Sequence, residues 1–88
     1  MAKYSVRIKK SARKELESIA TKADRRRVIK RIESLADNPR PSDALKLSGR
    51  ERYRIRQGRY RILYTIEDRV LVVHVIKIGD RKDVYRGK

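Results

Sequence analysis

One stretch decides the fold of this chain: Arg52-Tyr53-Arg54-Ile55-Arg56-Gln57-Gly58-Arg59-Tyr60-Arg61-Ile62-Leu63-Tyr64. Basic and apolar residues alternate along it, with one break at Gln57-Gly58. A period of two is typical of β-strands that bury one face and expose the other. The stretch therefore predicts two strands joined by a turn. The predicted core face consists of Tyr53, Ile55, Tyr60, Ile62 and Tyr64, and the predicted exposed face of Arg52, Arg54, Arg56, Arg59 and Arg61.

Arginines gathered on one sheet face repel one another, so packing alone gives no reason to collect them. A solvated face neutralised by salt bridges is the plainer interpretation, but Glu51 is the only acidic residue between Lys46 and Arg61. The guanidinium group holds a phosphate through two parallel hydrogen bonds. This face therefore predicts a site for a phosphodiester backbone, and Lys46 is included among the residues expected to attract RNA.

The composition of the whole chain agrees with a polyanionic partner. Its 88 residues include 26 Lys and Arg against 11 Asp and Glu, which gives a net charge of +15. A surface this basic attracts nucleic acid or an acidic protein. The apolar runs are distinct, so a folded domain is expected rather than disorder.

The length fits one small domain spanning residues 1–88. The absence of cysteine excludes disulfides, thiolate catalysis and cysteine-bound metal. No apolar run approaches the roughly 20 residues that cross a bilayer, and the first residues lack the apolar segment of a signal peptide. We therefore expect a cytoplasmic protein with no membrane partner.

Two helices are predicted between a first strand and the arginine-rich strands. Apolar residues alternate from Tyr4 to Ile8, which predicts the strand. The first helix is expected to start with Ser11 as its N-cap and to end near Thr21. The second starts near Asp24 and ends before Asn38-Pro39-Arg40-Pro41, because proline cannot continue a helix. Basic residues fill one side of this second helix between residues 22 and 31, which fits either a solvated face or a surface for nucleic acid or acidic peptides.

The remaining segments complete a sheet. Residues 42–51 are expected to form a connection in which Leu45 and Leu47 pack inward. The nearly continuous apolar run from Val70 to Ile76 predicts a central strand. The segment Asp83–Arg86 is a candidate last strand. The order predicts an α+β fold in which the N-terminal strand and a two-helix hairpin accompany a mainly antiparallel sheet of four strands, or five with the last segment. The helices cover one face, and the arginines occupy the other.

Other constellations give weaker signals. His74 is the single histidine and lies in an apolar strand, so we interpret it as structural, and a mechanism with paired histidines is excluded. No cluster of ligands predicts a metal site or another cofactor. Arg81 directly follows the predicted central strand, and Tyr85 could turn back toward the arginine face.

The whole chain resembles the RelE branch of the RelE/ParE toxin superfamily. The resemblance rests on the order of elements and on three blocks of sequence. These blocks are Leu45-Lys46-Leu47-Ser48-Gly49 leading to Tyr53-Arg54-Ile55-Arg56, then Gly58-Arg59-Tyr60-Arg61-Ile62-Leu63-Tyr64, and then Val75-Ile76-Lys77-Ile78-Gly79-Asp80-Arg81 with Val84-Tyr85. The resemblance implies a toxin that cleaves mRNA in the A site of the 30S ribosomal subunit and is held inactive by a cognate acidic antitoxin. It also implies the catalytic residues, which are Arg54, Arg56, Arg61, Arg81 and Tyr85.

The implied reaction needs no metal. The RNA 2′-hydroxyl attacks the adjacent phosphate while arginines stabilise the charge that develops there. The same positive field favours the ionised form of Tyr85, which could act as general base. Arg52, Arg59 and Lys46 would then attract the RNA. Two alternatives stay open, a ParE-like toxin that inhibits gyrase and a non-enzymatic basic module that binds RNA or the ribosome.

Overall fold

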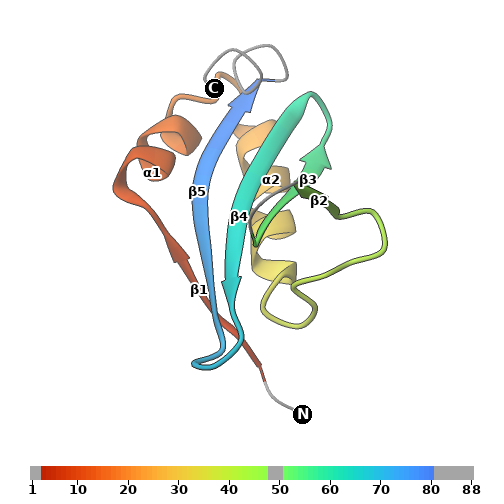
Figure 1. The fold of residues 1–88 in the computed structure, drawn as a ribbon. Helices are drawn as coiled ribbons and strands as arrows, with labels where there is room; N and C mark the ends of the chain where they lie inside the picture. The colour runs from red at the N-terminus through yellow and green to blue at the C-terminus, as the bar shows by residue number, and fades with distance from the viewer. Residues whose placement is uncertain (1–2, 48–50, 81–88) are drawn as a thin grey trace.

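The computed structural model describes residues 3–47 and 51–80 of the chain. Its elements follow in the order β1 (Ser5–Ile8), α1 (Lys10–Glu17), α2 (Lys22–Ser34), β2 (Leu45–Leu47), β3 (Arg52–Gln57), β4 (Tyr60–Glu67) and β5 (Val72–Asp80). The five strands form one sheet in the order β1-β5-β4-β3-β2. β1 runs parallel to β5, and the other neighbours are antiparallel. The predicted α+β class and mainly antiparallel sheet are confirmed (Figure 1).

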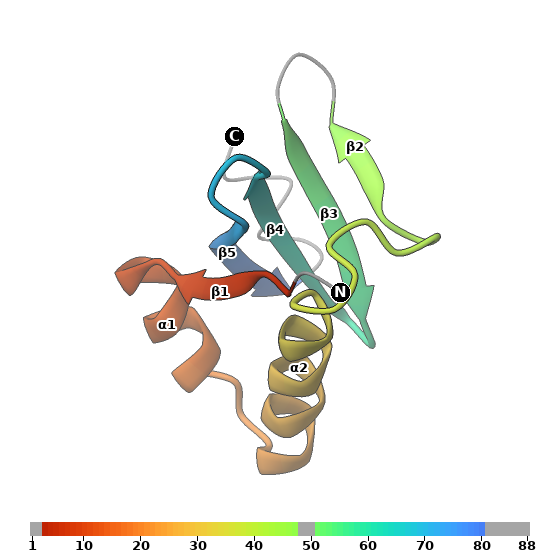
Figure 2. The same cartoon turned by 90° about the horizontal axis from the view of Figure 1, so that it is seen from below.

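Both helices lie on one side of the sheet (Figure 2). No helix of the described residues covers the other side, which is called the open face below. The buried core joins the helices to the inward face of the sheet. Its members include Ala12, Leu16, Val28, Ile32, Leu35, Tyr53, Ile55, Ile62, Tyr64, Val73, Val75 and Ile78. The inward face predicted from the alternating stretch is therefore confirmed for Tyr53, Ile55, Ile62 and Tyr64, while Tyr60 is half-buried at the margin of the core.

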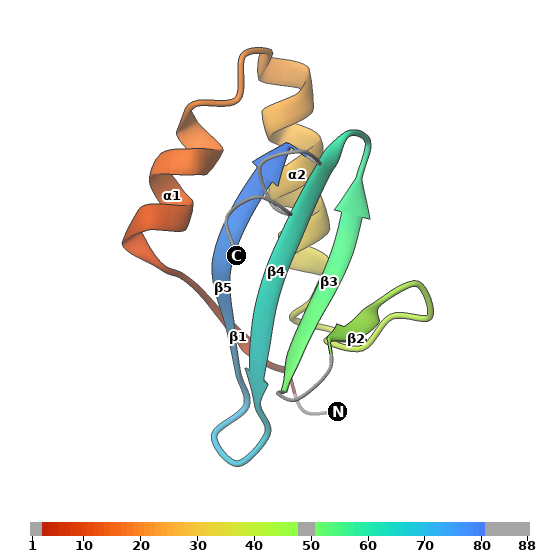
Figure 3. The same ribbon diagram turned by 45° about the horizontal axis from the view of Figure 1, so that its top comes forward.

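The fifth strand of the described sheet comes from a segment that we expected to be a connection. Leu45–Leu47 pairs antiparallel with Arg52–Arg54 and forms the edge of the sheet beside β3 (Figure 3). The prediction that Leu45 packs inward is wrong, because half of the residue (50%) is exposed. The candidate strand Asp83–Arg86 lies outside the described residues.

The helix starts also differ from the prediction. The amide of Lys9 still donates to the Val75 carbonyl at 2.9 Å, so α1 begins at Lys10, and Ser11 is not its N-cap. α1 ends at Glu17 rather than near Thr21. Thr21 instead caps α2, where its hydroxyl accepts from the Asp24 amide at 3.2 Å. This bond satisfies one of the amides that a helix start leaves without an intrahelical partner.

The central strand starts two residues later than predicted. Val70 and Leu71 belong to the β4–β5 connection, where Val70 is exposed and Leu71 has a φ of 55°. Gly58 has a φ of 60° in the two-residue loop between β3 and β4, a conformation that glycine adopts without strain. A bulge between Leu63 and Tyr64 shifts the β4–β5 register. Within the described residues, neither helix is long and apolar enough to cross a membrane.

Candidate nucleic-acid interface

Four arginines lie on the open face of the sheet because they alternate with the core residues of β3 and β4. Arg56 and Arg61 are direct Cα partners across the two strands. Arg54 lies opposite Leu63 and Arg52 opposite Thr65, so both follow at two-residue steps along β3. Side chains spaced two apart on a strand point to the same side. The structure therefore brings Arg52, Arg54, Arg56 and Arg61 together on one surface.

These arginines differ in exposure. Arg52 and Arg56 are exposed and Arg54 is half-buried, whereas Arg61 is only 5% exposed. A ligand can reach Arg56 and Arg54 directly in this conformation. Arg61 has little accessible surface but adds its positive charge to the same face.

Arg31 of α2 braces the edge of β3. Its Nε donates to the Arg56 carbonyl at 3.4 Å, and its terminal nitrogen bonds the Asp43 carboxylate. The Arg31 guanidinium lowers the pKa of Asp43 below its usual value. β2 pairs with β3 only as far as Arg54, so the Arg31 side chain contacts the edge of β3 just beyond the end of strand pairing. This contact could not be predicted from the sequence, because it depends on how α2 packs beside β3.

Two residues expected to attract RNA are held in ion pairs. The Arg59 Nε lies 2.6 Å from Oδ2 of Asp80, and Lys46 Nζ lies 3.1 Å from Oε2 of Glu51. Arg59 belongs to the turn before β4 rather than to the strand. Both side chains remain largely exposed, so solvent screens these pairs.

Arg81 and Tyr85 lie outside the described residues. The described chain ends at Asp80, which is the Cα partner of Tyr60, and the preceding Gly79 is the partner of Arg61. The register thus carries the chain to the immediate neighbourhood of Arg61 before these two residues begin.

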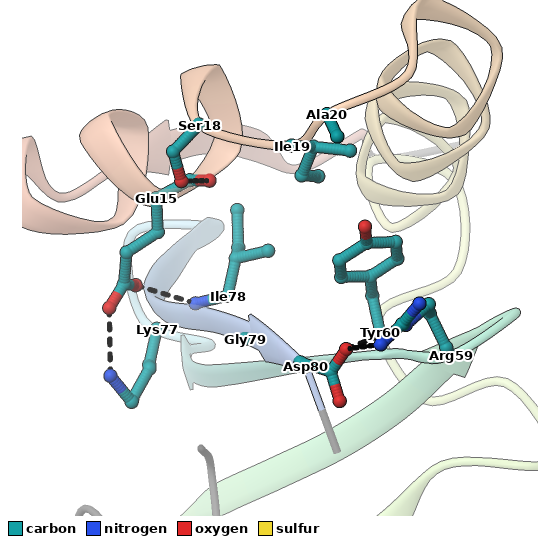
Figure 4. Close-up of a pocket in the computed structure, with 10 residues that line it drawn as sticks. All are labelled: Glu15, Ser18, Ile19, Ala20, Arg59, Tyr60, Lys77, Ile78, Gly79 and Asp80. Atoms are coloured by element: carbon teal, nitrogen blue, oxygen red, sulfur yellow. Dashed lines mark hydrogen bonds and ion pairs between the residues drawn. The ribbon is translucent and has the colours of Figure 1, made fainter. Parts of the chain in front are cut away.

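A pocket of about 370 Å³ separates the end of α1 from the ends of β4 and β5 (Figure 4). Glu15 is the central polar group, since its two oxygens accept from Lys77 Nζ at 2.7 Å and from the Ile78 amide at 2.9 Å. The Tyr60 ring points across the pocket toward Ile19. A second, basic hollow lies between α2 and the β3–β4 turn and is lined by Arg27, Lys30, Arg31, Ser34 and Gln57.

A polar network away from the arginine face was missed in the sequence. Asp68 accepts from Arg40 through two nitrogens, at 3.2 and 2.8 Å, and from the Tyr4 hydroxyl at 2.6 Å. Arg40 also donates to the Tyr53 hydroxyl at 3.1 Å and lies over its ring. These bonds lower the pKa of Asp68 to about 2, whereas burial raises the pKa of Tyr64 to about 12. Arg40 lies between two prolines, and we interpreted that segment only as a helix stop.

His74 contacts the Glu67 carboxylate through Nε2 at 2.8 Å. His74 is the Cα partner of Thr65, which is also the partner of Arg52, so His74 lies on the same face of the sheet as the arginines. Its structural role stays a prediction. In the part of the chain that the structure describes, no group of three His, Asp or Glu side chains is arranged to hold a metal ion.

The family model for the ParE toxin of type II toxin–antitoxin systems matches residues 6–85. The chain therefore belongs to this family, within the RelE/ParE superfamily.

Solved structures of RelE toxins share the fold. The archaeal RelE–RelB complex from Pyrococcus horikoshii is 33% identical, with a TM-score of 0.80 over 90% of this chain and 96% of that one. The isolated E. coli RelE toxin is 25% identical, with a TM-score of 0.75 over 97% and 99% of the two chains. The intact E. coli RelBE toxin–antitoxin complex is 27% identical, with a TM-score of 0.73 over 88% and 95%. A comparison with curated proteins gave no significant match.

Proposed function

We propose that this toxin inhibits translation by cutting mRNA in the ribosomal A site. The observation that carries the proposal is the grouping of Arg54, Arg56 and Arg61 on the open sheet face, next to the point where the chain continues toward Arg81. Fixed guanidinium groups stabilise the negative charge that develops on a phosphate under attack. The likeness to RelE toxins supports the same activity.

In the proposed reaction, the 2′-hydroxyl of one nucleotide attacks the phosphorus that follows it, and the 5′-oxygen of the next nucleotide leaves. Arg54 and Arg56 hold the non-bridging oxygens, and the buried charge of Arg61 strengthens the field. Tyr85 removes the 2′-hydroxyl proton. The ribosome aligns the attacking oxygen with the leaving group, which supplies much of the rate.

Programmed ribosomes and primer extension test this proposal. The full chain should give cuts within the A-site codon. We expect Arg56→Ala to slow cleavage by about 10²-fold, as loss of one charge-stabilising donor does. Tyr85→Phe should slow it by about 10²- to 10⁴-fold, as loss of a general base does. Near-wild-type cleavage by Tyr85→Phe would remove this residue from the mechanism.

Arg13→Ala is the matched control for these variants. Arg13 is an exposed arginine on α1, in the layer away from the open face, so its removal costs the same charge without touching the site. It should cleave at close to the wild-type rate. A loss equal to that of Arg56→Ala would show that net charge alone matters, as the non-enzymatic RNA-binding alternative requires.

Inhibition of gyrase is the second candidate, and the match to the ParE toxin model favours it. The same purified protein would then leave mRNA intact on ribosomes and block DNA supercoiling by gyrase. The row of arginines on the open face favours the ribonuclease.

We also propose a cognate antitoxin with an acidic segment. The similar structures include RelE–RelB complexes, and a net charge of +15 favours an acidic partner. Co-expression of the cognate antitoxin should relieve the growth inhibition that the toxin causes.

A further inference from the structure

A pocket lies on the arginine face, at the edge formed by β2 and β3. It measures about 310 Å³ and is lined by Asp43, Leu45, Arg54 and Arg56. This volume is at the lower end of the roughly 300–1,000 Å³ found for small-ligand sites. Its lining combines an apolar side chain, a carboxylate and two guanidinium groups. A phosphate site needs the guanidinium groups but neither the apolar side chain nor the carboxylate.

Leu45 supplies the apolar wall. It is the Cα partner of Arg54, and paired residues on neighbouring strands point to the same side of a sheet. Leu45 therefore lies on the open face, where half of the residue is exposed. It is one of two large apolar residues with such exposure among the described residues. An apolar surface between arginines offers a platform for the flat face of a nucleobase.

Asp43 supplies a fixed acceptor. Arg31 holds its carboxylate at Oδ2, and the same Arg31 is anchored to the Arg56 carbonyl. An ionised carboxylate offers about four lone-pair sites, so acceptor capacity remains after this bond. Asp43 pairs with Arg31, yet a carboxylate beside a phosphate clamp still weakens phosphate binding, and this cost suggests that Asp43 also accepts a hydrogen bond from the ligand.

We propose that this pocket binds one unpaired nucleobase of single-stranded RNA and selects guanine. Guanine is the base whose Watson–Crick edge presents two adjacent N–H donors, which match the two oxygens of a carboxylate. Uracil presents one N–H between two carbonyl acceptors that the carboxylate repels. Unpaired bases are commonly recognised in this way, with stacking on one face and hydrogen bonds at the edge. The proposal rests on RNA as the ligand of the arginine face and adds a base preference to it.

Binding of short RNAs to the full chain tests the proposal. The probes are a fluorescent uridine hexamer and the same hexamer with one central guanosine, both with 2′-O-methyl groups so that they cannot be cut. Wild-type protein should bind the guanosine probe about tenfold more tightly, at the scale of one bidentate base contact. Asp43→Asn should bring the two affinities within about twofold of each other. Equal affinities in wild type, or an unchanged ratio in Asp43→Asn, would overturn the proposal.

Two further variants separate recognition from folding. Leu45→Ala leaves the Arg31–Asp43 bond intact. It should weaken binding of the guanosine probe about threefold, with little effect on binding of the uridine probe. Asp37→Asn makes the same charge change at an exposed pair with Lys3 and should keep the wild-type ratio. If Asp43 served only to hold Arg31, Asp43→Asn would change both affinities equally, which contradicts the proposal.

This outcome is independent of the cleavage assay. Selective binding of the guanosine probe that Asp43→Asn abolishes would support the pocket. If ribosomes then showed no cut mRNA, that result would contradict only the proposed ribonuclease activity. Cleavage at the A site together with equal binding of both probes would contradict the pocket alone.

Discussion

Arginine serves at least three purposes in this molecule, and the groups around each side chain decide which. Arg40 is fixed by Asp68 and Tyr53, and Arg31 joins α2 to the edge of β3 through Asp43 and a backbone carbonyl. Arg56 donates no bond of this kind in the described structure, and it is exposed on the open face. A count of basic residues cannot separate these purposes, because each depends on acceptors distant in sequence.

The first residue-scale prediction concerns acid stability. Bonds from Arg40 and Tyr4 lower the pKa of Asp68 from 3.8 to about 2. The contribution of Asp68 to stability is therefore complete above its unfolded pKa and is lost as the pH falls through about 2. Asp68→Asn should unfold at lower urea concentration than wild type at neutral pH, and most of this difference should be lost by about pH 2.

Urea unfolding of both proteins along a pH series measures this effect. Asp37→Asn is the control, because Asp37 forms an exposed pair with Lys3 at 3.6 Å and should show a smaller difference at every pH. A difference in urea midpoint between Asp68→Asn and wild type that stayed constant down to pH 2 would contradict the predicted dependence of stability on the ionisation of Asp68.

At the scale of elements, α1 completes the edge of β5. β1 pairs with Val72–Val75, and beyond that point Glu15 of α1 accepts from the Ile78 amide at 2.9 Å. The Lys77 ammonium closes over the same carboxylate at 2.7 Å. Glu15 therefore takes the place of a neighbouring strand and fixes the distance between helix and sheet.

Removal of this carboxylate should loosen the helix from the sheet. Glu15→Ala leaves a partly buried amide without its acceptor, which costs about 1–3 kcal/mol of unfolding free energy. Glu17→Ala, at an exposed position of the same helix, should change the unfolding free energy by less than about 0.5 kcal/mol. Urea unfolding at neutral pH compares the two. Equal small changes in both variants would show that the Glu15 bond contributes nothing.

The sequence predicted the elements whose pattern is local. Two-residue alternation identified β3 and β4 and the sides of their residues, and the proline pair placed the end of α2. β2 was missed because three residues carry too little pattern, and its pairing with β3 depends on the path of the intervening loop. The Ser11 cap was wrong because pairing of Lys9 with β5 moved the helix start. Likewise, the arginine face was predictable, while Asp43 and Leu45 beside it were not.

At the scale of the whole molecule, the charge of +15 should make RNA binding strongly dependent on salt. Each phosphate contact with a single strand contributes a slope of about −0.7 to the logarithm of affinity against the logarithm of salt concentration. With about four such contacts, raising the salt concentration from 50 to 200 mM would weaken RNA binding roughly 50-fold. Arg56→Ala should flatten the slope by about 0.7, because it removes one contact.

Fluorescence anisotropy with a non-cleavable hexamer at several salt concentrations gives these slopes. Arg13→Ala should keep the wild-type slope, because α1 lies away from the open face. A slope that is unchanged in Arg56→Ala but flatter in Arg13→Ala would show that the RNA binds the helical layer instead of the open face.

The pairing of the first strand with the last has a consequence for synthesis. In the described sheet, β1 pairs with β5 alone, so residues 5–8 have no strand partner until residues 72–80 have been made. A nascent chain that stops before this point has an unfilled gap between β1 and β4. The arginine face then lacks the support of β5 beside β4. The arginine face therefore gains its full support only after residues 72–80 have been translated, and a shorter nascent chain on the ribosome lacks the finished surface.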